Sequence, residues 1–141
     1  MYSCVFFGHR DSPESLGPRL YEAIENLILH HQVNRFFVGH QGAFDRMAAD
    51  ILSQISAKYP AVDYAVVLTY LPSSGNPPRF AHPTLLPDGM ESIPRRFAIS
   101  HRNEWLLKQA DYVIGYMDHG WGGAARYLLK AQRQKKSVIL L

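Results

Sequence analysis

Three short segments of this sequence place glycine, histidine, arginine and aspartate directly after apolar runs. They are GHRD at 8–11, GHQGAFDR at 39–46 and DHGWGGAAR at 118–126. Glycine lets a ligand approach the backbone closely, and the guanidinium group of arginine matches phosphate and carboxylate groups. Where such a turn leads into a helix, the free N–H groups of the first helical turn add to the attraction for an anion. The three segments therefore predict a binding site for an anionic ligand.

Two arginines are the expected cationic groups of this site. In the first segment, Arg10 is the expected phosphate ligand. Asp11 beside it either orients Arg10, caps the following helix or bonds a ribose hydroxyl, and the residues alone leave these roles open. A fourth segment, RFAISHRNEW at 96–105, adds Arg102 and Asn103. Arg102 and Asn103 either face the same anion-binding site or belong to a solvated first turn of a helix.

The histidines also gather in these segments. Of seven in the sequence, His9, His40 and His119 follow the apolar runs. Their spacing matches no short metal-ligand motif, so we expect neutral, hydrogen-bonding histidines, no metal site and no cofactor. Cys4 is the single cysteine, which allows no disulfide within the chain. This favours a reducing compartment, and we predict a cytoplasmic location.

The segments are separated by an alternation of strand-like runs and amphipathic helical patterns. Strands are expected at 2–7, 35–39, 63–71, 111–117 and 137–141. Helices are expected at 14–31, 42–58, 95–109 and 122–134. Such an alternation produces parallel β-α-β units with right-handed crossovers. We therefore predict one α/β domain over 1–141, a three-layer Rossmann-like sandwich. Its five-stranded, mostly parallel sheet has the order 3-2-1-4-5 and helices on both faces.

This strand order brings the polar segments together. The first and fourth strands become neighbours at the switch point, where open α/β sheets bind their ligands. GHRD and GWGG are then expected on either side of one crevice. A long segment at 72–94, with six of the nine prolines, leaves the same end of the third strand. It is either a lid over the site or a loop packed on the surface or at a subunit contact.

The charge and hydrophobicity of the sequence limit the classes of partner that we expect. The residues are 47% hydrophobic and 19% charged, with a net charge of +3 and a pI of about 9.1. This composition supports a packed core and a mild preference for anionic ligands, but not the strong basic patch of a nucleic-acid-binding protein. No apolar stretch has the length of a membrane span. We expect neither nucleic acid nor a membrane as partner.

Five segments resemble the SLOG superfamily, and within it the small, stand-alone YpsA-like branch. In order along nearly the whole chain they are FFGHRD, FFVGHQGAFDRMAADIL, YAVVLTYLP, PRRFAISHRNEWLLKQADYVIGYM and GWGGAARYLLKAQRQKKSVILL. The superfamily is Rossmann-like and includes the LOG phosphoribohydrolases, the DNA-uptake protein DprA and domains that sense NAD-derived signals. The resemblance implies a nucleotide-derived small molecule held by glycine turns. By position it implicates Gly8, His9, Arg10, Gly39, Gly42, Asp45, Gly122, Gly123 and Ala124.

The resemblance also suggests how the parts of a nucleotide would be held. The expected roles are phosphate binding by Arg10 and the 122–123 turn, ribose binding by Asp45 or Asp11, and covering of the base by Trp121 or Phe80. Related folds often pair through helix faces, so we expect a homodimer.

One departure from the family pattern concerns catalysis. LOG hydrolases carry a glutamate shortly after the last glycine turn, in a G-G-x-G-T-x-x-E pattern, and the matching position here is Tyr127. Cleavage of an N-glycosidic bond needs a carboxylate near the anomeric carbon. Asp45, Glu91 and Glu104 are candidate substitutes. The missing glutamate favours a binding or sensing protein over an N-glycosidase, phosphoribohydrolase or deoxyribosyltransferase, and a DprA-like nucleic-acid accessory protein is a further alternative.

Overall fold

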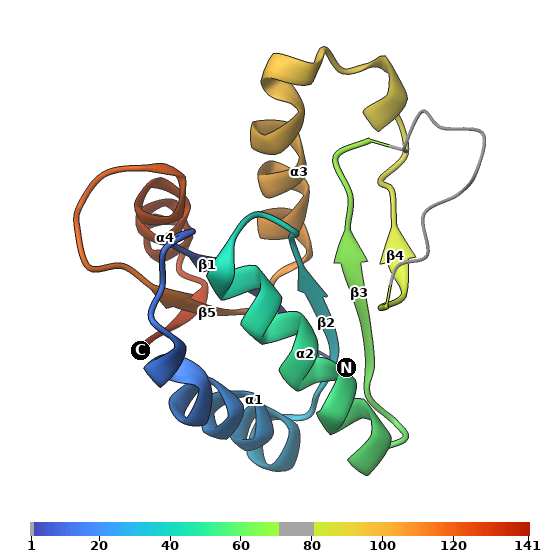
Figure 1. Cartoon of the computed structure of the whole chain (residues 1–141), viewed down its shortest axis with the longest axis vertical. Helices are drawn as coiled ribbons and strands as arrows, with labels where there is room; N and C mark the ends of the chain where they lie inside the picture. Colours follow the sequence, from blue (N-terminus) through green and yellow to red (C-terminus); the bar gives the residue numbers. More distant parts are fainter. Residues whose placement is uncertain (1, 71–80) are drawn as a thin grey trace.

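A six-stranded parallel sheet forms the middle layer of the molecule. The structure is a computed structural model that describes residues 2–70 and 81–141 (Figure 1). The strands are β1 Tyr2–Gly8, β2 Val33–Val38, β3 Asp63–Val67, β4 Thr84–Leu85, β5 Tyr112–Tyr116 and β6 Ser137–Leu140. Their order is β4-β3-β2-β1-β5-β6, and every pairing between them is parallel.

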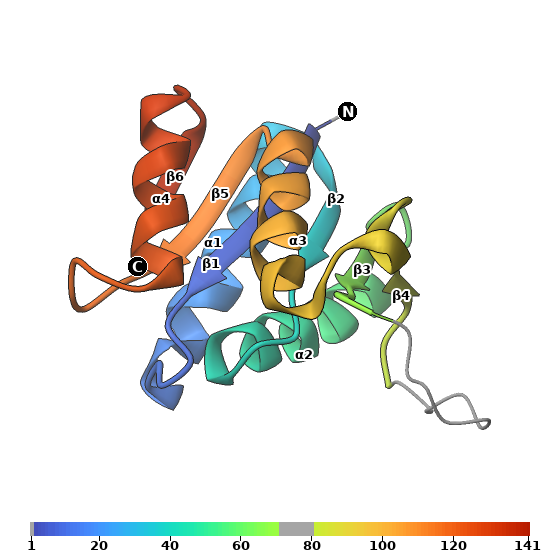
Figure 2. The same ribbon diagram turned by 90° about the horizontal axis from the view of Figure 1, so that it is seen from above.

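Two helices cover each face of the sheet (Figure 2). Their bounds are α1 Gly17–His31, α2 Ala43–Lys58, α3 Arg95–Gln109 and α4 Gly123–Arg133, with short 3-10 helices η1 Glu14–Leu16 and η2 Met90–Ser92. Helices α1 and α2 pack on one face, and α3 and α4 pack on the other. The molecule is therefore a three-layer α/β sandwich, as the sequence predicts.

The apolar periodicity of α2 shows why the helices dock on the sheet. Phe44, Ala48, Leu52 and Ile55 recur at helical spacing and are all fully buried. Burial of a large apolar side chain contributes roughly 1.5–3 kcal/mol, so this face stabilises the layer far more than helix propensity does. The same contacts place the N-terminus of α2 beside the carboxyl ends of the central strands.

The predicted order 3-2-1-4-5 is confirmed for the five predicted strands, which are β3, β2, β1, β5 and β6. The predicted number of strands is wrong, because β4 lies within the proline-rich segment at 72–94 and pairs with β3 at Val66–Thr84 and Val67–Leu85. Two residues next to Pro83 are too few for a strand pattern to be recognised. Of that segment, the structure describes 81–94. The third strand, expected at 63–71, ends at Val67.

The parallel register sets the position of the polar turns. Gly8, the last residue of β1, pairs with Tyr116, the last residue of β5, and Phe37 of β2 pairs with Val5. The turns after β1, β2 and β5 consequently leave the sheet at one edge. Among the described residues, no helix is both long enough and apolar enough to cross a membrane.

Substitution of Gly115 in β5 tests the close packing of α4 on the sheet. A Cβ atom there would lie 2.2 Å from Cδ2 of Leu128 and 2.8 Å from the carbonyl oxygen of Phe7, which the sheet holds in place. We expect Gly115→Ala to lower the free energy of unfolding by ~1–3 kcal/mol in urea denaturation. Gly120→Ala is the control, because among the described residues only Gly120 and its chain neighbours have atoms within 4 Å of this Cβ position. Equal effects of both substitutions would contradict this packing.

Candidate functional site

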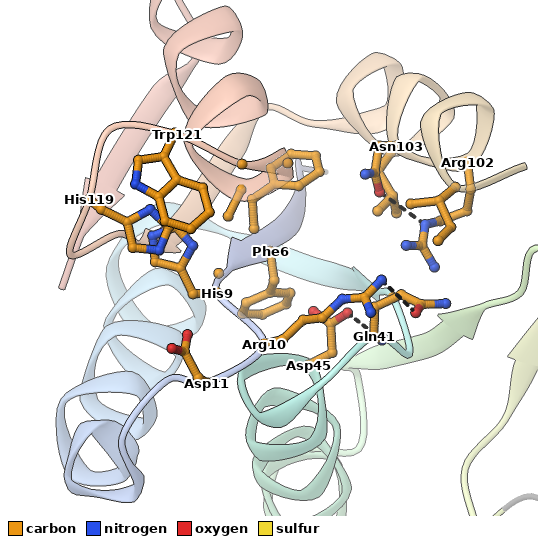
Figure 3. A pocket seen from close by; sticks show the side chains of 18 residues that line it. Phe6, His9, Arg10, Asp11, Gln41, Asp45, Arg102, Asn103, His119 and Trp121 are labelled. Atoms are coloured by element: carbon orange, nitrogen blue, oxygen red, sulfur yellow. Dashed lines mark hydrogen bonds between the residues drawn. The ribbon is translucent and has the colours of Figure 1, made fainter. Parts of the chain in front are cut away.

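A cavity of about 390 Å³ opens at the carboxyl edge of the sheet (Figure 3). Its walls come from the turn after β1, the turn after β2 with the start of α2, helix α3, and the loop that leads from β5 into α4. The lining residues are Phe6, Phe7, Gly8, His9, Arg10, Asp11, Gly39, Gln41, Asp45, Ile99, Arg102, Asn103, Leu106, His119, Trp121, Gly122, Gly123 and Ala124. The structure thus brings nine of the ten predicted ligand residues to one cavity, all except Gly42.

Gly42 holds two of the cavity's turns together instead of lining it. Its φ of +93° lies in the left-handed region, and a Cβ atom would come within 2.5 Å of Cα of Arg10. The next residue, Ala43, donates its backbone N–H to the carbonyl oxygen of Arg10 at 2.8 Å. Only glycine therefore lets the turn after β2 lie against the turn after β1.

Gly8 is required for packing as well. A Cβ atom at this position would lie 2.1 Å from Cγ of Phe44, so the aromatic ring at the start of α2 fills the space beside the end of β1. The first strand is expected to end at residue 7, whereas in the structure Gly8 is the last residue of β1. The glycine allows α2 to approach β1 closely.

The two predicted arginines differ in their surroundings. Arg10 is exposed and donates from Nη2 to Oε1 of Gln41 at 3.3 Å. Arg102 is only 2% exposed and donates from Nη1 to the carbonyl oxygen of Val67 at 3.1 Å and from Nε to Oδ1 of Asn103 at 3.0 Å. It lies inside the cavity wall and not in a solvated helical turn. Burial lowers the pKa of Arg102, nearby Asp45 opposes this change and Arg10 adds to it.

Asp45 is the acidic group of the cavity interior. It is 7% exposed, and Oδ2 accepts the backbone N–H of Gln41 at 2.9 Å. Burial raises the pKa of Asp45 to about 6, although this hydrogen bond and the charges of Arg102 and Arg10 act in the opposite direction. A Cβ atom at Gly39 would lie 2.8 Å from Oδ2 of Asp45 and 2.9 Å from Nη1 of Arg102. Gly39 thus leaves room for both the acid and the cation to approach the backbone where a side chain would begin.

The other candidate acids do not line the cavity. Glu104 accepts a hydrogen bond from Nζ of Lys130 at 2.6 Å, on the outer side of α3 and α4. Glu91 is exposed in η2. Tyr127, at the position where the resemblance to LOG hydrolases would place a glutamate, is 2% exposed, stacks on Phe7 and donates its hydroxyl to the carbonyl oxygen of Ser100. This position therefore belongs to the core between α4, α3 and β1.

Three rings form a stack at the other end of the cavity. The imidazoles of His9 and His119 lie 3.7 Å apart between centroids, and Trp121 stacks on His119 at 4.0 Å (Figure 3). His9 is buried, whereas Trp121 is 73% exposed. The outer face of Trp121 is thus accessible to another planar group. Phe80, the alternative residue for covering a base, lies outside the described residues.

His40, the third histidine of the polar segments, faces a different cavity. This second cavity, of about 200 Å³, lies between the start of α2 and the strands β3 and β4, and shares Gly39 and Asp45 with the first. Burial lowers the pKa of His40, and the charge of Arg102 lowers it further. His40 therefore does not share a cavity with His9 and His119.

Two polar residues that the sequence analysis did not assign take part in the site. Gln41 bonds both Arg10 and Asp45 through its side chain and backbone. Asp118 lies within 3.5 Å of the imidazoles of His9 and His119. Both residues follow a predicted strand at the same sheet edge, so their position was a usable signal, but an amide or an acid in a turn has many other common roles.

The fold and the site define an α/β protein of Rossmann-like architecture with a polar cavity at the switch point of its sheet. Its fold is similar to that of DNA processing protein A (DprA) from Streptococcus pneumoniae, solved by X-ray crystallography. The two chains superpose with a TM-score of 0.67 at 16% sequence identity, over 99% of this chain and 50% of the DprA chain. The chain thus spans about half the length of that protein, and at this identity the likeness establishes the fold.

Comparisons at the level of sequence identify no relative. No family model matches the chain, and no curated protein matches it. The relation to other proteins therefore rests on the DprA-like fold.

The raised pKa of Asp45 predicts a pH dependence of stability. The pKa is about 6 in the folded chain and about 3.9 in the unfolded chain, so between these values the folded state holds a proton that the unfolded state has lost. The stabilisation is complete below about pH 4 and is lost as the pH rises through about 6. We expect the wild-type free energy of unfolding to fall by roughly 2–3 kcal/mol between pH 4 and pH 7 relative to that of Asp45→Asn.

Urea denaturation at a series of pH values measures this difference. Asp88→Asn, which removes an exposed carboxylate, is the control and should follow the wild-type curve. Parallel curves for wild type and Asp45→Asn would mean that Asp45 ionises normally in the folded chain.

Proposed function

We propose that this chain binds a nucleotide-derived small molecule in the 390 Å³ cavity, with its phosphate between the arginines and the start of α4. The observation that carries the proposal is that Arg10, Arg102 and the first residues of α4 all line this one cavity. Helix α4 begins after Gly122, whose φ is +95°, and its first N–H groups have no partner within the helix. Two guanidinium groups and a helix N-terminus are a strong combination for an anion.

The other groups of the cavity suit the remaining parts of such a ligand. Asp45 is an acceptor for ribose hydroxyl groups, and the exposed face of Trp121 offers a stacking surface for a base. The cavity volume falls within the range of roughly 300–1,000 Å³ that is usual for small-molecule sites. The resemblance to the YpsA-like branch of the SLOG superfamily, cytoplasmic location and homodimer formation are parts of this proposal.

An N-glycosidic bond hydrolase or transferase is a second candidate, and the position of Asp45 favours it. Of the three candidate acids, Asp45 alone lines the cavity, and a carboxyl group with a pKa of about 6 can donate a proton near neutral pH. In that reaction Asp45 would protonate the leaving base or stabilise the positive charge at the anomeric carbon.

Nucleic acid binding is a third candidate. The fold is similar to that of a DNA processing protein. In addition, Arg95 lies over the ring of Tyr70 and Arg96 over that of Phe97, so exposed aromatic and cationic groups meet at the start of α3. Exposed pairs of this kind suit single-stranded nucleic acid. The modest net charge of +3 makes this candidate weaker than the first two.

Replacement of Arg10 tests the binding proposal. We expect Arg10→Ala to weaken the binding of a nucleoside monophosphate by ~1.5–3 kcal/mol, because a charged hydrogen bond is lost. The affinity for the corresponding nucleoside should stay nearly unchanged. Arg19→Ala, an exposed arginine on α1, is the matched control. Isothermal titration calorimetry with both ligands measures the difference.

Two results would reject the role of Arg10. One is an equal loss for the nucleoside and its monophosphate. The other is an unchanged affinity for the monophosphate. Tight, salt-dependent binding of a single-stranded oligonucleotide, with no binding of monophosphates, would favour the third candidate.

A turnover assay distinguishes the small-molecule binding protein from the N-glycosidic bond hydrolase or transferase. The chain is incubated with nucleoside monophosphates and NAD, and the released base is measured by chromatography. If the chain is a hydrolase, we expect Asp45→Asn to reduce base release by about 100-fold or more, as for loss of a general acid, and Glu104→Gln to have little effect. Binding without release in the wild type supports a sensor, and release that is independent of Asp45 would exclude the acid proposed above.

A further inference from the structure

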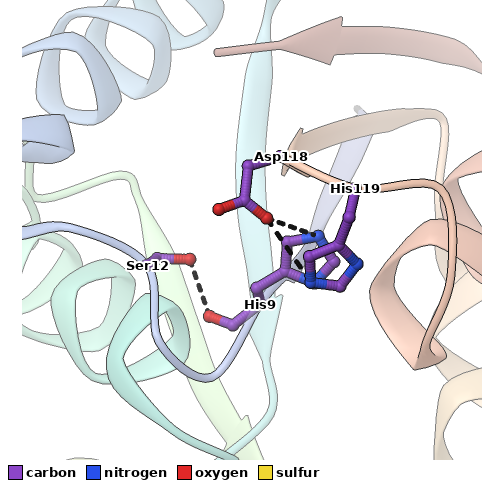
Figure 4. A network of polar contacts seen from close by, with 4 residues as sticks. All are labelled: His9, Ser12, Asp118 and His119. Atoms are coloured by element: carbon purple, nitrogen blue, oxygen red, sulfur yellow. Dashed lines mark hydrogen bonds and ion pairs between the residues drawn. The ribbon is translucent and has the colours of Figure 1, made fainter.

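We propose that His9, Asp118 and His119 form a binding site for a transition-metal ion of the Zn²⁺ type at the edge of the cavity. His9 follows β1, and Asp118 and His119 follow β5 (Figure 4). The sequence predicts no metal site because His9 and His119 are 110 positions apart, so no short motif contains them. The parallel pairing of Gly8 with Tyr116 brings them together.

The distances between the donor atoms match those of a metal site. Oδ1 of Asp118 lies 3.5 Å from Nε2 of His9 and 3.4 Å from Nε2 of His119. Two ligands at 2.0–2.1 Å from a tetrahedral Zn²⁺ ion are separated by about 3.3 Å. One donor atom from each of the three residues lies within 4.8 Å of the others. The two Asp118 distances are therefore within a few tenths of an ångström of the separation expected in a zinc site.

Buried nitrogen atoms without partners provide an independent indication of a ligand. His9 is 6% exposed, and its Nε2 makes no hydrogen bond within the part of the chain that the structure describes, although it faces the carboxylate of Asp118. Nδ1 of His119 is also buried and without a hydrogen bond among those residues, although Nε2 is the nitrogen of that ring that faces Asp118. A buried polar atom in this condition costs free energy, and coordination of an ion by Nε2 of His9 would remove that cost at His9.

The chemistry of the three groups selects the ion. Two imidazoles and one carboxylate suit Zn²⁺ and neighbouring transition metals, whereas Mg²⁺ and Ca²⁺ prefer oxygen ligands. The competing cation Arg10 is directed toward Gln41, so it lies in a different part of the cavity from the histidines (Figure 3). Three protein ligands also leave a coordination position for an oxygen atom of a bound molecule.

The stacking of the two imidazole rings shows which movement is needed before both can bind one ion. The imidazoles of His9 and His119 are stacked, with planes 23° apart, and the lone pairs used for coordination lie in those planes. Convergence on one ion therefore requires His119 to tilt further. His119 stacks on His9 on one side and on the exposed Trp121 on the other, so the tilt also requires Trp121 to shift toward solvent.

Calorimetric titration of the full chain with ZnCl₂, after treatment with a chelator, tests the site. We expect one ion to bind per chain, with affinity at least ~10-fold lower in Asp118→Asn and in His119→Ala. Loss of a residue that only hydrogen-bonds a metal ligand already lowers metal affinity by about this factor, and loss of a ligand lowers it at least as much. Asp50→Asn is a matched control, because Asp50 is also an exposed carboxylate beside a histidine, with Oδ1 3.2 Å from Nε2 of His82. It should retain wild-type affinity.

The proposal is overturned if the wild-type chain binds no Zn²⁺, or if Asp118→Asn and Asp50→Asn bind it equally well. Both aspartates are exposed, so neither variant is expected to unfold, and circular dichroism checks this. The titration uses the metal alone, so its outcome does not depend on whether the cavity binds a nucleotide.

Discussion

The contact between Gly42 and the backbone of Arg10 determines the shape of the site. A side chain at position 42 would overlap Cα of Arg10, and the positive φ of Gly42 would strain any other residue. Because this contact is made, Ala43 can bond the carbonyl oxygen of Arg10, and α2 starts directly beside the turn after β1. That placement brings Asp45 to the cavity and Phe44 to the end of β1. The binding groups are therefore consequences of a backbone arrangement that the two turns share.

The charged groups of the cavity lining are a buried pair and an exposed pair. Asp45 and Arg102 are both buried, and each favours the charged form of the other, whereas Arg10 and Asp11 are both exposed. Burial of a charged group is costly unless it is paired, and the hydrogen bonds of Arg102 to Val67 and Asn103 offset only part of that cost. In the proposed complex, the phosphate would add a further partner for the buried guanidinium group of Arg102.

Residues with a clear local pattern could be predicted from the sequence, and those defined by contacts across the fold could not. The strand order and the convergence of Arg10 with Gly123 followed from β-α-β alternation, because parallel strands end at one edge. Strand β4 was missed because two residues carry no periodicity. The burial of Arg102, in the middle of α3, was also not predictable, since an arginine is rarely buried. The proximity of His9 to His119 depends on strand pairing at a separation of 110 positions, which spacing rules for metal motifs do not cover.

The two ends of the cavity differ in how firmly their groups are held, and this difference bears on function. Arg102 is fixed by a strand carbonyl and a neighbouring side chain, and α4 is anchored through Tyr127 to Phe7 of β1. An anion would therefore meet donors that are already in place, which reduces the entropic cost of binding. Trp121, in contrast, is mostly exposed and contacts the site through a stack on His119. In the proposed nucleotide complex, the phosphate would therefore meet the fixed Arg102 and the start of α4 together with the exposed Arg10, and Trp121 would accommodate different bases.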